Sequence, residues 1–165
     1  MQYTWNTASP EETIALAEQI GAKLRPGDVI AYRGDLGAGK TTFTRGLAAG
    51  MGIKELVTSP TFALVHEYGG EPPLAGASQC SKAAKVGKCP SLIHFDMYRI
   101  ADENELETTG FYDYPQEDSV FAIEWSENIE AALPAHTMTL TIERTGEESR
   151  RITLKGDERF ADIGT

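Results

Sequence analysis

One stretch constrains this chain more than any other. Residues 34–41 read Gly-Asp-Leu-Gly-Ala-Gly-Lys-Thr and fit the pattern G-x-x-x-x-G-K-[ST]. Its glycines allow consecutive backbone N–H groups to turn inward around a phosphate. Lys40 supplies a mobile positive charge for phosphate oxygens, and the Thr41 hydroxyl is placed to bind Mg²⁺. The residues expected to contact the phosphates are Asp35, Leu36, Gly37, Ala38, Gly39, Lys40 and Thr41.

The segments on either side give this motif the context that it requires. Residues 28–33 favour a short strand, and residues 41–49 place Phe43, Leu47 and Ala48 on one side of a helix. The N-terminus of that helix adds its positive dipole end to the site. A strand, a glycine-rich loop and a helix in this order are typical of a nucleotide-binding P-loop.

Helix and strand signals alternate in the first part of the chain, and hairpins dominate the second. Ser9 is a good helix N-cap, Pro10 suits the first helical position, and Glu12 completes a capping box. We predict further strands at residues 63–68, 92–99, 119–123, 138–142 and 151–155, and short helices at 102–108 and 126–133. The pattern predicts an α/β fold: a three-layer, P-loop NTPase-like sandwich around a mixed parallel and antiparallel sheet.

The length of 165 residues predicts a single domain over residues 1–165, with a flexible inserted loop at about residues 70–90. That loop is rich in Gly, Pro, Ser, Ala and Lys, and it contains Cys80 and Cys89. Two cysteines without a C-x-x-C motif indicate free thiols and not a zinc site or a disulfide framework.

Charge and hydropathy exclude several classes of protein. The net charge of −10 disfavours strong direct binding to nucleic acid, because an acidic domain repels a phosphate backbone. No apolar run approaches the roughly 20 residues of a membrane span. The first residues lack the basic start and apolar stretch of a signal peptide, so we expect a cytoplasmic protein.

Two acidic residues are candidates for chemistry beside the phosphates. Glu124 ends an apolar run typical of a buried strand, where parallel sheets bind ligands, so it is a candidate Mg²⁺ ligand. Asp96 would share one face of a strand with His94 and Tyr98, and it could orient or deprotonate a water. The alternatives are an ordinary exposed acid at the end of a strand for Glu124, and a satisfied polar network for the face that carries Asp96.

Other residues leave their roles open. Trp125 beside Glu124 either stacks on a partner or packs internally. Residues 58–61, Thr-Ser-Pro-Thr, follow the P-loop helix and form either a loop that senses the γ-phosphate or a surface turn. Four arginines could supply a charge for the transition state, and the sequence does not choose among Arg33, Arg45, Arg99 and Arg144.

These blocks together resemble the TsaE (YjeE) family. The shared residues are the P-loop through Thr42, then Ser59-Pro60-Thr61, then His94-x-Asp96-x-Tyr98-Arg99, then Glu124-Trp125. The similarity runs from about residue 9 to about residue 142. The segment 72–90 is longer than the family spacing and lies between two predicted strands.

The resemblance implies a bacterial cytoplasmic ATPase that uses ATP and Mg²⁺. It would help to form N6-threonylcarbamoyladenosine at position 37 of tRNAs that read codons beginning with adenine. It would act with TsaD and TsaB, reset their complex between turnovers, and meet tRNA only through that complex. The implied catalytic residues are Asp96, Glu124, Lys40 and Thr42; the implied metal ligands are Thr41 and Glu124; Thr42 and Trp125 join the nucleotide-binding residues.

Three other functions compete with this one. A GTPase is disfavoured because the Asn/Thr-Lys-x-Asp and D-x-x-G motifs are missing. A small-molecule kinase fits the size, but the sequence has no Arg-rich lid segment. A nucleotide-sensing module without meaningful turnover is compatible with Lys40, Thr41 and Glu124.

Overall fold

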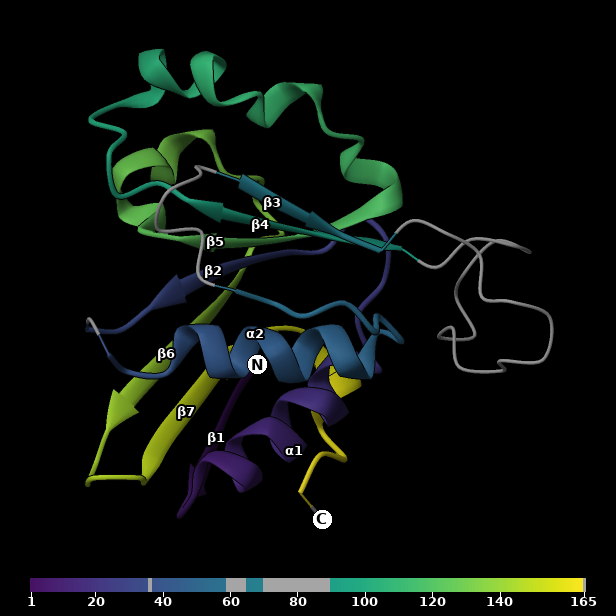
Figure 1. Cartoon of the computed structure of the whole chain (residues 1–165), viewed down its shortest axis with the longest axis vertical. Coiled ribbons are helices and arrows are strands. Elements are labelled where there is room, and N and C mark those ends of the chain that lie inside the picture. Colours follow the sequence, from purple (N-terminus) through teal and green to yellow (C-terminus); the bar gives the residue numbers. More distant parts are fainter. Residues whose placement is uncertain (36, 59–64, 70–89, 165) are drawn as a thin grey trace, which may run out of the picture.

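The computed structural model describes residues 1–35, 37–58, 65–69 and 90–164. Within these residues the strands form one seven-stranded sheet in the order β1-β7-β6-β2-β5-β4-β3 (Figure 1). β2 is parallel to both of its neighbours, β5 and β6, and β4 is parallel to β5; the outer pairings are antiparallel. The strands are β1 (Gln2–Thr7), β2 (Val29–Arg33), β3 (Val65–Tyr68), β4 (Ser91–Asp96), β5 (Ser119–Glu124), β6 (Met138–Arg144) and β7 (Arg150–Lys155).

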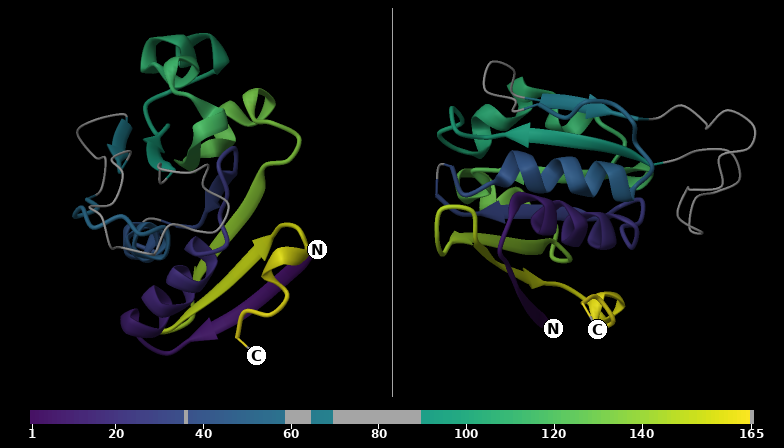
Figure 2. Two further views of the ribbon diagram at one scale, coloured as in Figure 1. Left: turned by 90° about the vertical axis from the view of Figure 1, so that its right-hand side faces the viewer. Right: turned by 60° about the horizontal axis from the view of Figure 1, so that its bottom comes forward.

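Helices cover both faces of this sheet, as Figure 2 shows. One face packs against the two α-helices, α1 (Pro10–Gly21) and α2 (Lys40–Gly50). The other face is covered by short 3₁₀ helices and buries a second, aromatic-rich cluster. The helices on this face are η1 (Glu103–Thr109), η2 (Phe111–Asp113), η3 (Gln116–Asp118) and η4 (Ser126–Ala132). A further 3₁₀ helix, η5 (Glu158–Phe160), lies near the C-terminus and adds Phe160 to the core under the α-helices. The predicted α/β fold with a mixed sheet is confirmed.

The start of α1 is fixed by the residues that the sequence indicated. The Ser9 side chain accepts a hydrogen bond from the N–H of Glu12, at 3.2 Å. The Glu12 carboxylate in turn accepts from the N–H of Ala8, at 2.7 Å. Pro10 takes the first helical position, where it has no hydrogen bond to lose. The helix therefore begins at a reciprocal cap, and it then packs across α2.

Several elements differ from the sequence prediction. β1 was not predicted, although its side chains alternate in burial and it pairs along its whole length with β7. β4 ends at Asp96, because Tyr98 and Arg99 form a turn, so Tyr98 does not share the strand face of His94 and Asp96. The two short helices predicted at 102–108 and 126–133 exist, but both are 3₁₀.

Some predictions fall on residues that the structure does not describe. These are Leu36 of the P-loop, Ser59-Pro60-Thr61, and the inserted loop with Cys80 and Cys89. In the described part of the chain, no helix is both long and apolar enough to span a membrane.

Candidate nucleotide-binding site

The glycine-rich stretch connects the end of β2 to the start of α2, as the motif requires. Gly39 has φ +103°, a left-handed conformation that disfavours residues with a Cβ, and it caps the N-terminus of α2. The loop is closed by a 3.0 Å hydrogen bond from the N–H of Ala38 to the carbonyl of Asp35. Lys40 is the first residue of the helix, is 9% exposed, and donates to the carbonyl of Gly34 at 3.2 Å. This is the kind of backbone turn with which P-loops bind a phosphate.

A buried polar contact fixes the helix against the strand beneath this loop. The hydroxyls of Tyr32 on β2 and Thr44 on α2 lie 2.7 Å apart, and Thr44 also donates to the carbonyl of Lys40 at 2.8 Å. Burial raises the pKa of the Tyr32 hydroxyl far above its usual range, so it stays protonated. The Tyr32–Thr44 contact therefore fixes the first turns of α2 against β2.

The strands bring the two predicted carboxylates together. In the parallel pair of β4 and β5, Asp96 lies directly opposite Glu124. β5 also pairs with β2, where Ala31 faces Ile123, so Glu124 lies one residue beyond this pair. The carboxyl ends of β2, β4 and β5 therefore meet at one edge of the sheet, which is where parallel sheets bind ligands.

Strand alternation directs both carboxylates toward the P-loop helix. On β4, Leu92 belongs to the core under α1 and α2, and Phe95 belongs to the core on the opposite face. On β5, Val120 likewise packs under the α-helices. Asp96 and Glu124 follow Leu92 and Val120 by four residues, so both fall on the α2 face.

Glu124 is 6% exposed and is not an ordinary strand-end acid in solvent. Its Oε1 lies 3.2 Å from Nε2 of His94, a side chain on β4 that is fully buried. A buried carboxylate of this kind needs a hydrogen-bond donor or a cation beside it. The position therefore suits a metal ligand.

Asp96 lies in a different environment from Glu124, because it is only partly buried. Its Oδ1 accepts a 3.0 Å hydrogen bond from the N–H of Tyr98. Burial raises the pKa of the Asp96 carboxyl above its usual value, and the charge of Glu124 adds to the rise. The hydrogen bond from the backbone N–H of Tyr98 and the side chains of His94 and Lys40 act in the opposite direction. A carboxylate with a raised pKa is better matched to accepting a proton.

Trp125 is held in an unusual backbone conformation beside the P-loop lysine. Its φ of +56° makes it the one non-glycine residue with positive φ in the described part of the chain. The Lys40 ammonium lies 5.2 Å from the centre of the Trp125 ring, within the range of a cation–π contact. Tyr98 stands on the turn that follows β4, and the centre of its ring lies 5.0 Å from the centre of the Trp125 ring. Positive φ in a bulky residue is strained, and such strain persists where neighbouring contacts over-determine it.

Arg33 at the end of β2 supplies those neighbouring contacts. Its guanidinium hydrogen-bonds the hydroxyl of Ser126 and pairs with Glu127 at 3.3 Å and Glu130 at 3.6 Å. Ser126 and Glu127 directly follow Trp125, and Glu130 lies in the same 3₁₀ helix, η4. Arg33 therefore anchors the segment that carries Trp125, and its guanidinium is engaged there and not with the P-loop.

Sequence reasoning missed the arginine that contacts the P-loop. Arg150, at the start of β7, donates from Nε to the carbonyl of Ala38 at 2.8 Å. Its Nη1 donates to the carbonyls of the preceding turn: Gly146 at 3.4 Å, Glu147 at 3.3 Å and Ser149 at 2.8 Å. No local pattern signals this role, because 112 residues separate the two partners. Two other candidates are engaged elsewhere: Arg45 with the carbonyl of Val57, and Arg144 with the carbonyl of Gly146.

The residues present fit a magnesium ion. Thr41 stands in the first turn of α2 and Glu124 at the adjacent strand end, and Mg²⁺ prefers such hydroxyl and carboxylate oxygens. Thr42 is the next residue of the same turn and is partly buried. Phosphate oxygens of a bound nucleotide would supply further ligands.

Comparisons with known proteins identify one family. The sequence model of the family described as "Threonylcarbamoyl adenosine biosynthesis protein TsaE" matches residues 7–152. A Bacillus subtilis protein named "tRNA threonylcarbamoyladenosine biosynthesis protein TsaE" is 41% identical over 93% of this chain and 85% of its own length. A Treponema pallidum protein of the same name is 32% identical over 88% of this chain and 95% of its own length.

A solved structure shows a similar fold. The crystal structure of Bacillus subtilis YdiB superimposes with a TM-score of 0.66 at 33% identity, and the match covers 99% of this chain and 91% of that one.

Proposed function

Because this chain belongs to the TsaE family of threonylcarbamoyl adenosine biosynthesis proteins, we propose that it binds and hydrolyses ATP during that biosynthesis. The product would be N6-threonylcarbamoyladenosine at position 37 of tRNAs that read codons beginning with adenine. The observation that best supports ATP hydrolysis is the pairing of Asp96 with Glu124 at the strand edge beside the P-loop. A site that only held a nucleotide would not need the second carboxylate.

Each residue has a distinct task in this proposal. The N–H groups of residues 35–42 and the Lys40 ammonium bind the phosphates, and Trp125 lies against Lys40. Thr41 and Glu124 hold Mg²⁺, which neutralises phosphate charge when bound. Asp96 orients the attacking water and accepts its proton, since its raised pKa favours that step. The hydroxyl of Thr42 adds a contact at the phosphate end of the helix.

Substituting the two carboxylates tests the proposal. We expect Asp96→Ala to retain ATP binding and to lose hydrolysis by a factor of 100 or more, about the contribution of a general base. Glu124→Ala should retain only part of the binding, because Mg²⁺ loses a ligand. Binding would be followed with a fluorescent ATP analogue, and hydrolysis in single turnover with ATP labelled at the γ-phosphate. Unchanged hydrolysis in Asp96→Ala would remove that residue from the mechanism.

The same labelled ATP distinguishes hydrolysis from the alternatives. Label recovered only as free phosphate supports an ATPase. Label on another small molecule supports a kinase, and unchanged ATP in the presence of partner proteins supports a nucleotide-sensing module.

The partners belong to the proposal as well. TsaD and TsaB are the expected partners, and ATP cleavage would reset their complex between turnovers. The net charge of −10 opposes direct binding to tRNA, which supports an indirect role for this chain. A pull-down with and without ATP, probed for TsaD and TsaB, tests the cycle. Association that depends on ATP supports it, and a different set of partners contradicts it.

A further inference from the structure

His94 is a polar side chain that the proposed chemistry does not use. It lies on β4 between β3 and β5, and none of its surface is exposed. The ring contacts Tyr32 edge-on, with ring centres 6.4 Å apart. Nε2 lies 3.2 Å from Oε1 of Glu124, and Nδ1 has no hydrogen-bond partner in the part of the chain that the structure describes. The imidazole therefore makes a single side-chain hydrogen bond within the described residues, and that bond goes to the candidate metal ligand.

The chemistry of the pair fixes the direction of this hydrogen bond. An ionised carboxylate only accepts hydrogen bonds, so Nε2 must carry a proton and donate a hydrogen bond to Glu124. Nδ1 then stays inside the protein without a partner among the described residues, whether or not it carries a proton. A buried polar atom without a partner costs about 1–3 kcal/mol. An apolar side chain of similar size would avoid this cost, so stability alone does not explain a histidine at this position.

We propose that His94 is a positioning residue for Glu124. It fixes one carboxylate oxygen with the Nε2 proton and leaves the second oxygen free for Mg²⁺. This rests on the proposed function, because it assigns a task to His94 only if Glu124 holds the ion. Groups that orient metal ligands in this way typically contribute 10-fold to 100-fold to metal affinity. The effect of losing His94 should therefore appear in the Mg²⁺ dependence of nucleotide binding.

A matched set of variants isolates the Nε2 proton. His94→Phe keeps a planar ring against Tyr32 and removes the donor. His94→Gln places an amide N–H near the position of Nε2 and restores the donor. His94→Asn has a shorter side chain whose amide cannot reach Glu124, and it replaces the Phe variant if that variant does not fold. The experiment measures the Mg²⁺ concentration that half-saturates binding of a fluorescent ATP analogue, and the affinity for the same analogue in EDTA.

We expect His94→Phe to need about 10-fold more Mg²⁺ than wild type, and His94→Gln to stay within about threefold of it. Affinity in EDTA should be unchanged in both variants. Equal Mg²⁺ requirements in His94→Phe and wild type would overturn the inference and leave the proposed function intact. An equal loss of affinity in EDTA would also overturn it, since that result indicates a merely structural role. A wild-type protein whose ATP binding ignores Mg²⁺ would overturn both proposals.

Discussion

At the scale of single residues, the site depends on contacts that hold the phosphate loop in shape before any nucleotide binds. Arg150, which lies 112 residues further along the chain, donates to the carbonyl of Ala38, and Arg33 anchors the segment after Trp125. Both guanidiniums have several donors in a fixed planar fork, so each bridges two segments at once. The Lys40 ammonium remains at the surface of Trp125, close to where phosphates would lie. Preorganisation of this kind lowers the entropy lost on binding.

Arg150 should therefore contribute to ATP affinity. Arg150→Ala removes a charge-assisted hydrogen bond to the Ala38 carbonyl, and we expect affinity to fall by about 10-fold. Arg150→Lys should recover part of the loss, because one ammonium cannot reach both the P-loop and the β6–β7 turn. The measurement is titration of a fluorescent ATP analogue at constant ionic strength. Arg151→Ala is the matched control, since Arg151 is exposed and carries the same charge; an equal loss there would indicate a net-charge effect instead.

Asp96 should lower the stability of the unliganded protein at neutral pH. Its raised pKa means that the folded state favours the protonated carboxyl, so the charged form costs stability once the pH exceeds that pKa. Asp96→Asn, which can still accept from the N–H of Tyr98, should gain at most about 1 kcal/mol at pH 7. The gain should shrink as the pH falls through the raised pKa toward the ordinary value of 3.8. Urea unfolding of both proteins from pH 7 to pH 3.5, without Mg²⁺ and nucleotide, measures this difference in the free energy of unfolding. An Asp96→Asn variant that is less stable than wild type at pH 7 would contradict the prediction.

At the scale of elements, local patterns predicted most of the fold, and they failed where distant packing decides. The P-loop, the cap of α1 and the buried strand β5 were predicted because each is encoded by consecutive residues. The 3₁₀ geometry of η1 and η4 was not predicted, because short helices are shaped by the sheet face that they cover. The contacts of Arg150 with Ala38 and of His94 with Glu124 join distant segments, so no sequence spacing indicates them. Trp125 was identified, but its backbone conformation was not.

The crossing of α1 and α2 depends on a close approach at Gly46. A Cβ built on Gly46 would lie 2.7 Å from the carbonyl oxygen of Ile14 and would collide with the Cβ of Ala17. Alanine is the better helix former by about 0.5–1 kcal/mol, but here the helices would have to separate. We expect Gly46→Ala to reduce the free energy of unfolding by about 1–3 kcal/mol in urea unfolding.

The control for this helix crossing is Ala49→Ser, at an exposed position of the same helix, which should change stability by less than about 0.5 kcal/mol. A more stable Gly46→Ala variant would show that helix propensity outweighs the close approach.

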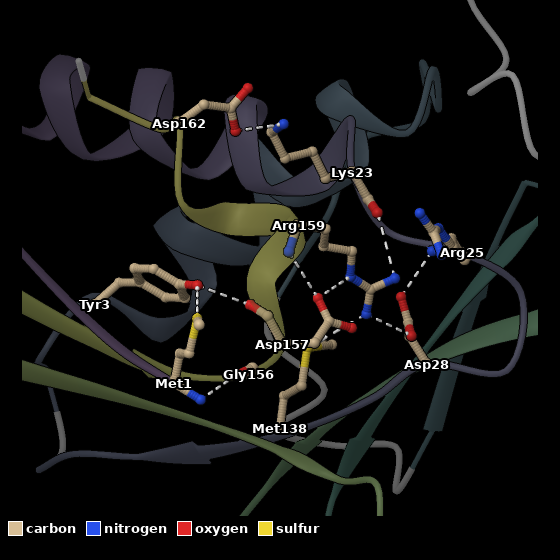
Figure 3. Close-up of polar contacts among 10 residues, drawn as sticks. All are labelled: Met1, Tyr3, Lys23, Arg25, Asp28, Met138, Gly156, Asp157, Arg159 and Asp162. Atoms are coloured by element: carbon tan, nitrogen blue, oxygen red, sulfur yellow. Dashed lines mark hydrogen bonds and ion pairs between the residues drawn. The ribbon is translucent and has the colours of Figure 1, made fainter.

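At the scale of the whole molecule, the C-terminal segment closes the core on which the P-loop helix rests. Phe160 and Ile163 are buried in the core under the α-helices, and Trp5 of β1 donates to the carbonyl of Ile163 at 3.1 Å. This segment lies beyond residues 7–152, the part that the family model matches. Figure 3 shows how Arg159 holds it: the guanidinium lies between Asp157, Asp28 and the carbonyl of Lys23. Asp28 directly precedes β2, so the C-terminus is tied to the strand that leads into the P-loop.

The ion pair of Arg159 with Asp28 should stabilise the protein more than the nearby ion pair of Lys23 with Asp162. Arg159 and Asp28 lie 2.8 Å apart with side chains 12% and 13% exposed, whereas Lys23 and Asp162 lie 2.7 Å apart at 30% and 72%. Removing one partner of a largely buried pair leaves the other carboxylate undercompensated, so we expect Arg159→Ala to cost about 2 kcal/mol in urea unfolding. Lys23→Ala is the control and should cost less than about 1 kcal/mol, because water screens its pair. Backbone amide hydrogen exchange in β1 and β7 should be faster in the Arg159 variant, since the C-terminal segment is no longer held against the core. Equal costs for the two variants would show that the C-terminal segment is held by Phe160 and Ile163 and not by its charge.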